Sequence, residues 1–251
     1  MKEQLYQYIL SLGDSSMILG HRLSELCGHG PNLETDIALT NISLDLFGQV
    51  RNYFQYAASL KEDEKANEDS IAFLRYPNEY RNVLLVEQPN TDFAYVIARQ
   101  FLFDAFHRPF LEGLSQSNDE TLVAIAKKSL KEVQYHLRFS SQWMKRLGDG
   151  TEESSRRIQA AVDYLWPYVG ELFAVGELET EMMGYGIAPD MEVVQAEALQ
   201  IIGQTFAEAK IIQPDSPWTQ SGGKTGVHTE HLGFILADLQ YMQRTYPQMT
   251  W

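Results

Sequence analysis

Four side chains in the middle of the chain could together take part in metal chemistry. The sequence DAFH places Asp104 three residues before His107, and Asp45 and His136 stand in two other segments of helical periodicity. Residues three apart lie one turn apart on the same face of a helix, so a carboxylate and an imidazole at this spacing can hold one metal pair. Helical bundles that bind two metal ions take one Glu from each of two helices and a Glu-x-x-His pair from each of the other two.

The carboxylates are too few for that layout. Val133 stands three residues before His136, where a ligand Glu is needed, and the first helix offers only Ser16 at the middle of its apolar seam. Glu132 lies four residues before His136 and outside the seam, so we expect it to point away. The sequence predicts a buried polar network in which His107 bonds Asp104, Gln49 or a water and Asp45 bonds a neighbouring helix. We expect a degenerate site without metal, whose candidates are Asp45, Asp104, His107 and His136.

A second group of candidates precedes the last helical segment. In GGKTGVHTEH, residues 222–231, two histidines stand three residues apart, but no third ligand has the spacing of a zinc site. Thr229 and Glu230 suit the N-terminus of a helix through capping and through the helix dipole. We therefore predict that this segment caps the helix or contacts a partner. The partner-interface candidates are Gly222, Gly223, Lys224, His228, Glu230 and His231.

Helices must position these candidates, and the sequence shows their periodicity. Apolar residues recur in steps of three and four over about 5–26, 34–60, 91–114 and 118–147. We expect Asn90 or Thr91 to cap the third helix and the fourth to open near Asn118. Helices of about 25 residues span about 35 Å, the format of a long four-helix bundle. Further helices are predicted over 152–168, 190–209 and 229–245, with irregular segments at 74–89 and 211–226. The prediction is an all-α fold in a single domain, 1–251.

Composition excludes several classes of protein. The chain has 251 residues, with 20 Lys and Arg against 34 Asp and Glu, and its net charge of -14 disfavours nucleic-acid binding. Cys27 is the only cysteine, which excludes an intrachain disulfide and suits a reducing, cytoplasmic location. The longest aliphatic run, 83–86, is far shorter than the roughly 20 residues of a membrane span, so we expect no membrane partner.

Four long motifs resemble the C subunits of phenylacetyl-CoA epoxidase, the PaaC family. They are DIALTNISLDLFGQVRNYFQYAA (36–58), LLVEQPNTDFAYVIARQFLFDAFH (84–107), KEVQYHLRFSSQWMKRLGDGTEES (131–154) and GGKTGVHTEHLGFILADLQYMQR (222–244). The resemblance covers nearly the whole chain and implies a ferritin-like subunit that pairs with a related catalytic A subunit. It also implies that the A subunit holds a di-iron centre and, with further subunits, epoxidises the ring of phenylacetyl-CoA. In the catalytic relative, Glu stands at the position of Val133.

From this resemblance we expect a non-catalytic structural subunit, with no cofactor of its own, in a homo- or hetero-oligomer. Trp and Tyr are enriched at interface hot spots. The aromatic anchors predicted on that ground are Tyr6, Tyr8, Trp143, Trp166, Trp218 and Trp251. Two alternatives stay open. One is an autonomous metal-dependent oxygenase that uses the four candidates of the degenerate site. The other is a CoA-recognition subunit with a basic face formed by Lys127, Lys128, Lys131, Arg138, Lys145 and Arg146.

Overall fold

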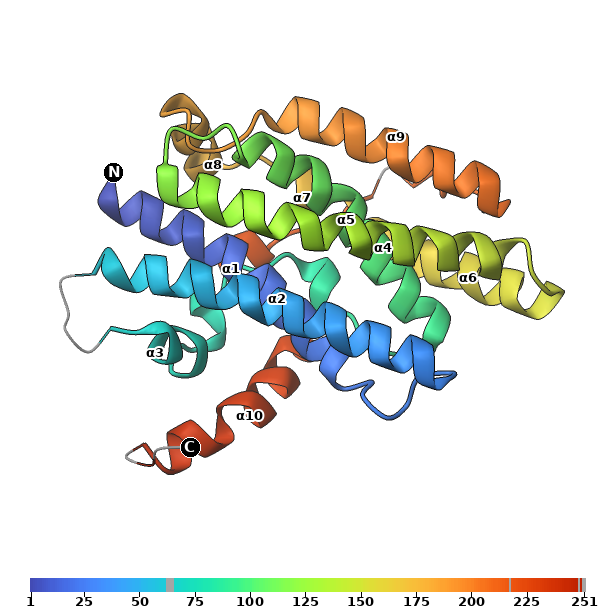
Figure 1. Cartoon of the computed structure of the whole chain (residues 1–251), viewed down its shortest axis with the longest axis horizontal. Coiled ribbons are helices and arrows are strands. Elements are labelled where there is room, and N and C mark those ends of the chain that lie inside the picture. Colours follow the sequence, from blue (N-terminus) through green and yellow to red (C-terminus); the bar gives the residue numbers. More distant parts are fainter. Residues whose placement is uncertain (62–65, 217, 248, 250–251) are drawn as a thin grey trace.

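Four long helices form the body of the molecule. The computed structural model describes residues 1–61, 66–216, 218–247 and 249. Its long helices are α1 (Lys2–Ser24), α2 (Leu33–Ser59), α4 (Phe93–Leu114) and α5 (Glu120–Gly148). Helix α1 packs along α2 and α4 packs along α5, while α2 also contacts α5 (Figure 1). The described residues contain no strand, and the arrangement is an all-α ferritin-like bundle with additional helices after α5.

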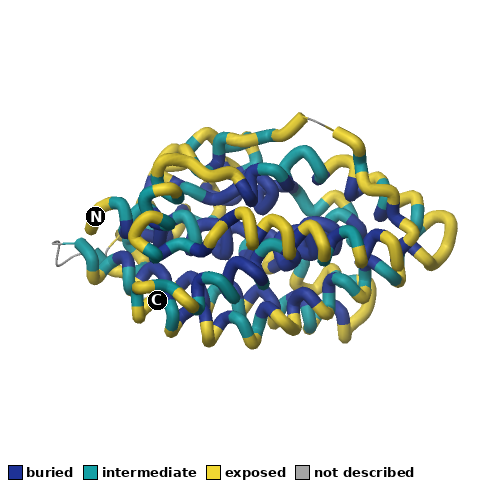
Figure 2. The backbone as a smooth tube through the Cα atoms, turned by 90° about the horizontal axis from the view of Figure 1, so that it is seen from above, coloured by how far each residue is buried: buried dark blue, intermediate teal, exposed yellow. Residues whose placement is uncertain are grey.

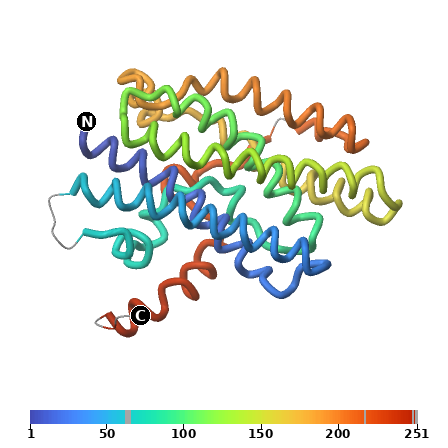
Figure 3. Tube along the Cα trace, viewed as in Figure 1, coloured from blue at the N-terminus to red at the C-terminus, as the bar shows by residue number. Residues whose placement is uncertain are grey.

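Shorter elements surround this body. They are α3 (Glu68–Phe73), α6 (Glu152–Leu165), α7 (Gly170–Phe173), α8 (Glu177–Gly184), α9 (Met191–Ala209), α10 (Glu230–Thr245) and the 3₁₀ turns η1 (Pro77–Glu79), η2 (Leu84–Glu87), η3 (Trp166–Tyr168) and η4 (Gly223–Thr225). Helices α6 and α9 pack against α4 and α5, whereas α10 diverges from the bundle and contacts α3 and η1 (Figure 3). Of the described helices, none has both the length and the apolar character that crossing a bilayer requires.

Side-chain caps set where two of the long helices begin. The carboxylate of Asp92 accepts hydrogen bonds from two backbone N–H groups in the first turn of α4, so the predicted cap at Asn90 or Thr91 is wrong by one or two residues. Asp119 caps α5 in the same way, one residue after the predicted opening at Asn118. A carboxylate at these positions satisfies free N–H groups and also complements the positive end of the helix dipole.

The apolar seams meet in a core that runs along the middle of the bundle (Figure 2). Gly13 of α1 touches the ring of Phe54 on α2, and a Cβ at that position would lie 2.4 Å from the Cε1 atom of the ring. No side chain larger than hydrogen fits at this distance. Glycine in the middle of α1 therefore allows the two helices of the first hairpin to approach closely.

The predicted aromatic anchors lie in different environments. Tyr8 is only 2% exposed and belongs to the core, so the prediction that it anchors a partner is wrong. Trp218 is 60% exposed, and Tyr6, Trp143 and Trp166 are half-buried against the core. Trp251 lies outside the described residues. The burial of Tyr8 follows from its place on α1, because it stands between the buried seam residues Leu5 and Ile9.

The segment 74–89, predicted to be an irregular crossover, runs through the interior. It forms the two turns η1 and η2, and η2 contacts both α1 and α4. Its residues 83–88 are all buried, and so is Asn82, which precedes them. The polar side chains of Asn82, Glu87 and Gln88 are thus removed from solvent. Because buried polar groups require hydrogen-bond partners, this crossover must receive partners from other segments. In the segment 211–226, the described residues, which leave out 217, are irregular as predicted apart from the turn η4.

Candidate functional site

A layer of polar side chains crosses the bundle between α2, α4 and α5. We call it the central polar layer, and it consists of Asp45, Gln49, Gln100, Asp104, His107, Glu132, His136 and Ser140. Neighbours on each helix are three or four residues apart and therefore share one face. Nε2 of His136 lies 3.0 Å from Oδ2 of Asp45, which confirms the predicted hydrogen bond from Asp45 to a neighbouring helix.

Asp104 is the fully buried carboxyl of this layer. Its Oδ1 accepts a hydrogen bond from Nε2 of Gln100 at 2.7 Å, and its Oδ2 accepts one from the hydroxyl of Ser140 at 2.8 Å. Desolvation raises the pKa of Asp104 to about 7, although the nearby His136 and the two hydrogen bonds favour the charged form. A carboxyl with this pKa takes up or releases a proton near neutral pH.

His107 does not join Asp104, although the two stand three residues apart. Neither Asp104 nor Gln49 bonds the imidazole, and Nδ1 of His107 has no partner among the described residues. The ring packs on Phe103 with their centroids 5.0 Å apart. Ser140 and Gln100 occupy the carboxylate oxygens of Asp104, so the His107 hydrogen bonds to Asp104 or Gln49 suggested by the spacing are wrong. Burial lowers the pKa of His107 to about 3, and repulsion from His136 adds to this effect.

The positions where metal ligands would be needed carry other side chains. Val133 is fully buried next to the layer, and Ser16 is buried on α1. Glu132 does approach the layer, because Nε2 of Gln49 donates to its Oε2 at 3.2 Å. The prediction that Glu132 points away is therefore wrong. The prediction failed because residues four apart share a helical face as closely as residues three apart, so Glu132 lies on the same face as His136.

Among the described residues, no group of three or more His, Cys, Asp and Glu side chains converges so that it could hold a metal ion. The structure brings Asp45 together with His136 and holds Asp104 between Gln100 and Ser140. The carboxylates of Asp45 and Asp104 thus have separate protein partners. The geometry of the layer matches an internal hydrogen-bonding network more closely than the four-carboxylate layout of a two-metal bundle.

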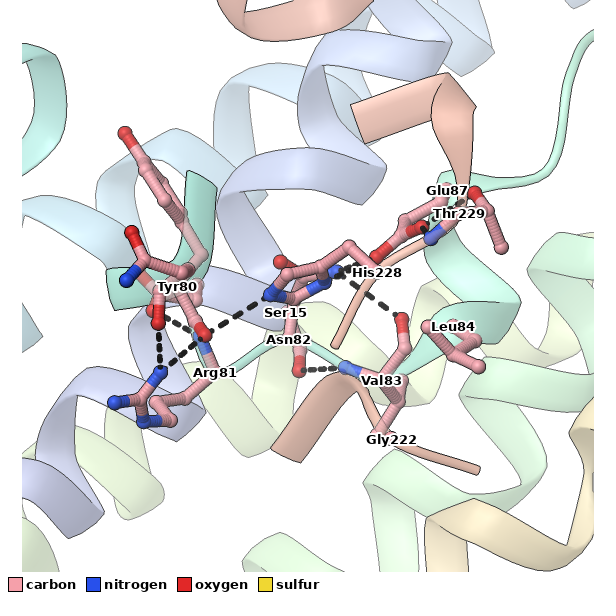
Figure 4. Close-up of polar contacts among 12 residues, drawn as sticks. Ser15, Tyr80, Arg81, Asn82, Val83, Leu84, Glu87, Gly222, His228 and Thr229 are labelled. Carbon is pink, nitrogen blue, oxygen red and sulfur yellow. Dashed lines mark hydrogen bonds and ion pairs between the residues drawn. The ribbon is translucent and has the colours of Figure 1, made fainter. Parts of the chain in front are cut away.

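A second polar cluster joins the crossover to the start of α10 (Figure 4). Glu87 is 0% exposed, and its carboxylate accepts four hydrogen bonds. The donors are Asn82, the ring of His228 and both the backbone N–H and the hydroxyl of Thr229. An ionised carboxylate only accepts hydrogen bonds, so it fits a position that four donors face. This arrangement of donors favours the ionised form of Glu87.

His228 completes an ion pair with Glu87. Its Nδ1 lies 2.6 Å from Oε1 of Glu87, and its Nε2 lies 3.0 Å from the carbonyl oxygen of Tyr80. A carboxylate and a carbonyl both accept, so each ring nitrogen must carry a hydrogen. With Glu87 ionised, the imidazole of His228 is an imidazolium, and it connects α10 to the crossover through charge as well as through hydrogen bonds.

Three of the predicted partner-interface residues make contacts inside the chain. The N–H of Gly222 donates to the carboxylate of Glu171 at 2.8 Å, and Nζ of Lys224 lies 3.5 Å from Oε1 of Glu179. Gly223 is buried, and a Cβ there would lie 2.2 Å from a backbone carbonyl oxygen of the crossover. This part of the segment therefore holds the crossover and α7 in place.

The remaining candidates mark the beginning of α10. The helix starts at Glu230 after Thr229, as predicted, but the hydroxyl of Thr229 bonds Glu87 instead of the helix backbone. His228 lies in the ion pair, Glu230 is exposed, and His231 is half-buried. A contact with a partner stays a prediction for these residues, and Glu230 is the exposed one of the six candidates.

Sequence reasoning missed the residues that hold this second cluster together. Glu87 is the one charge within LLVEQP, and a charged residue in such an apolar run signals an internal partner. Arg99 is also buried, and it donates to the carbonyl of Gln88 and to the side chain of Asn90. Burial lowers the pKa of Arg99 to about 9. No spacing rule points to Arg99, because its partners lie on the irregular crossover.

Comparisons with known proteins agree with the resemblance that the motifs indicated. A family model described as "Phenylacetic acid catabolic protein" matches residues 1–251. A protein of Escherichia coli (strain K12), named as the C subunit of 1,2-phenylacetyl-CoA epoxidase, is 45% identical over 248 residues, which cover 99% of each chain. The similarity thus includes the central polar layer, the crossover and the start of α10. The chain belongs to the phenylacetic acid catabolic protein family.

Proposed function

We propose that this chain is a non-catalytic structural subunit of phenylacetyl-CoA epoxidase. In this role it pairs with a homologous di-iron catalytic A subunit and stabilises it during aerobic phenylacetate catabolism, together with the other subunits of the complex. The 45% identity to a relative named as the C subunit, over nearly the full length of both chains, supports the assignment. The chain itself would carry no cofactor and no active site.

The side chain of Val133 is the observation that carries the non-catalytic part of the proposal. It is fully buried, and it stands three residues before His136, where a ligand carboxylate would complete a Glu-x-x-His pair. A valine offers no atom that coordinates a metal ion. The first helix presents Ser16 at its corresponding inward position, so two of the required carboxylates are replaced.

The outer face of α2 supports a role in assembly. Leu33, Ile37 and Leu44 are 69%, 50% and 61% exposed. Their spacings of four and seven residues place them along one side of the helix, and we call them the α2 stripe. An exposed row of large aliphatic side chains is typical of a protein–protein contact. We propose that the α2 stripe lies within an obligate interface, which commonly buries about 2,000 Å² or more.

We also propose a cytoplasmic location. Cys27 is a free and exposed thiol, and it suits a compartment in which thiols stay reduced. This part of the proposal is independent of the pairing with the A subunit. Fractionation of cells that express the chain at natural levels would test it.

Co-expression with the catalytic A subunit tests the main proposal. We expect the two chains to co-purify, and we expect the A subunit to be more soluble and to turn over faster in the presence of this chain. Metal analysis of the chain purified alone, without chelator, should show far less than one iron per chain. Two spectroscopically coupled irons in the isolated chain, lost in Asp104→Ala, would instead support an autonomous oxygenase.

A further inference from the structure

A cavity of about 50 Å³ lies between α1, α2, α4 and the crossover. At about 10 to 15 Å³ for each water position, it has room for roughly three to five small atoms. Apolar side chains form much of its wall, among them Leu12 of α1, Phe103 and Phe106 of α4 and Leu172 of α7. The cavity is separate from the hydrogen-bonded pairs of the central polar layer, although His107 belongs to both.

Four polar side chains from three different helices line this cavity without a hydrogen-bond partner. They are the hydroxyls of Tyr8, Ser16 and Tyr53 and the imidazole of His107, and all four residues are at most 5% exposed. In the described part of the chain, no hydrogen bond reaches any of these groups, and the hydroxyl of Tyr8 and Nδ1 of His107 are fully enclosed. Buried polar groups are nearly always paired, so these four groups call for a bound molecule.

The chemistry of the walls restricts what that molecule can be. Burial lowers the pKa of His107 to about 3 and raises the pKa of Tyr53, so both groups are neutral near pH 7. Of the two cations that line the cavity, Lys224 is paired with Glu179, and the guanidinium of Arg81 donates to the backbone carbonyls of Asn78 and Tyr80. The walls thus favour an uncharged occupant over an ion. A water cluster would face the rings of Phe103 and Phe106 without bonding them, whereas an amphiphile gains from both kinds of wall.

We propose that this cavity binds a small neutral molecule with a hydrogen-bonding group on a compact apolar body. Its polar end would meet Ser16, Tyr53 or His107, and its apolar body would pack on Phe103 and Phe106. About five non-hydrogen atoms fit the volume. This site goes beyond the structural role, because none of these buried side chains is available to a partner subunit.

Titration of the full-length chain with pyrazole tests the proposal. Pyrazole is neutral at about pH 7.5 and is a five-membered ring of non-hydrogen atoms, with one donor and one acceptor. We expect saturable binding in the millimolar range or tighter by NMR, with shifts of resonances from α1 and α4, and ring density in the cavity of soaked crystals. Ser16→Val removes a hydroxyl and narrows the space, so it should weaken binding at least tenfold. Tyr53→Phe removes one hydroxyl with little change of shape and should weaken binding about three- to tenfold.

Tyr135→Phe is the matched control, because it removes the hydroxyl of an exposed tyrosine on α5 that does not line the cavity. It should bind pyrazole as the natural chain does. The proposal is overturned if pyrazole shows no saturable binding or if soaked crystals show water alone in the cavity. It is also overturned if folded Ser16→Val and Tyr53→Phe both bind pyrazole as tightly as the control.

Discussion

His228 and Glu87 lie 141 positions apart in the chain and form an ion pair, with Nδ1 and Oε1 2.6 Å from each other. The carboxylate is fully buried, and the imidazolium side chain is 5% exposed. Removing one member of a buried pair leaves the other charge without compensation, which costs more than the pair itself contributes. The attachment of α10 to the rest of the protein therefore depends on both charges.

Glu87→Gln should destabilise the protein strongly. The substitution preserves shape but leaves the imidazolium of His228 buried without a counter-charge, so we expect the free energy of unfolding to fall by about 3 kcal/mol or more. Urea unfolding measures this change, and amide hydrogen exchange should show faster opening of α10. Glu230→Gln is the control at an exposed site of the same helix, and its effect should stay within about 0.5 kcal/mol. Equal stability of the two variants would refute the ion pair.

Asp104 should make stability depend on pH between about 4 and 7. Its pKa is about 7 in the folded protein and about 3.9 in an unfolded chain. In this window the folded state binds more protons, so the contribution of Asp104 to the free energy of unfolding falls as pH rises. Asp104→Asn removes this dependence. Relative to that variant, the natural chain should lose about 1.4 kcal/mol per pH unit at most.

The comparison with Asp104→Asn is needed because His107 acts in the opposite sense. Its pKa is about 3 when folded and near 6.5 when unfolded, so its contribution to stability is lost as pH falls through this range. Urea unfolding at several pH values between about 4 and 8 separates the two effects. Asp238→Asn changes an exposed position of α10. Its free energy of unfolding should therefore vary with pH as that of the natural chain does. If the free energy of unfolding of Asp104→Asn also varies with pH as that of the natural chain does, Asp104 does not titrate in this window.

Charge on the α2 stripe should weaken pairing with the catalytic subunit. The double variant Ile37→Glu and Leu44→Glu places two carboxylates in the proposed interface, where they would be desolvated without partners. Both positions are at least 50% exposed in the single chain, so its fold should be unaffected. Co-purification should be lost or reduced at least tenfold. Val193→Glu, at a position of α9 with 54% exposure, is the control. Normal pairing by the double variant would remove the α2 stripe from the interface.

Two glycines of the first hairpin should respond in opposite directions to alanine. Gly13→Ala places a methyl group against the ring of Phe54, and we expect a loss of about 1 to 3 kcal/mol from overpacking. A Cβ at Gly48 of α2 meets nothing within 4 Å, so Gly48→Ala should gain about 0.5 to 1 kcal/mol through helix propensity. Thermal and urea unfolding of the two variants, compared with the natural chain, would measure both effects. A loss of similar size at both positions would contradict the close contact.

Helical periodicity predicted the four long helices because each seam is a local property of its own segment. It also predicted that Asp104 and His136 would lie in the middle of the bundle and that Asp45, on the flank of its helix, would bond a neighbouring helix. Periodicity did not predict the orientation of the His107 side chain. Whether His107 bonds Asp104 or lines the cavity depends on Ser140 of α5, which donates a hydrogen bond to Asp104. The prediction that Glu132 points away failed for another reason. The inward face of a helix is wider than its row of apolar residues, so a residue beside that row can still face the neighbouring helices.

The connection between the crossover and α10 could not be predicted from sequence patterns. Glu87, Tyr80 and His228 meet only after distant segments have packed, and irregular segments have no period that shows which side is buried. The buried carboxylate of Glu87 still left a signal, because it interrupts an aliphatic run. A partner for it could have been expected, but not the identity of that partner.

The order in which the ribosome releases the chain gives the Glu87 contact a further consequence. Thr229 supplies two of the four donors and follows Glu87 by 142 positions. At about 5 to 20 residues per second, translation needs on the order of ten seconds to cover that interval. During that time the emerging crossover carries a carboxylate that resists dehydration. We therefore expect the nascent bundle to close over its own middle only after Thr229 has been synthesised.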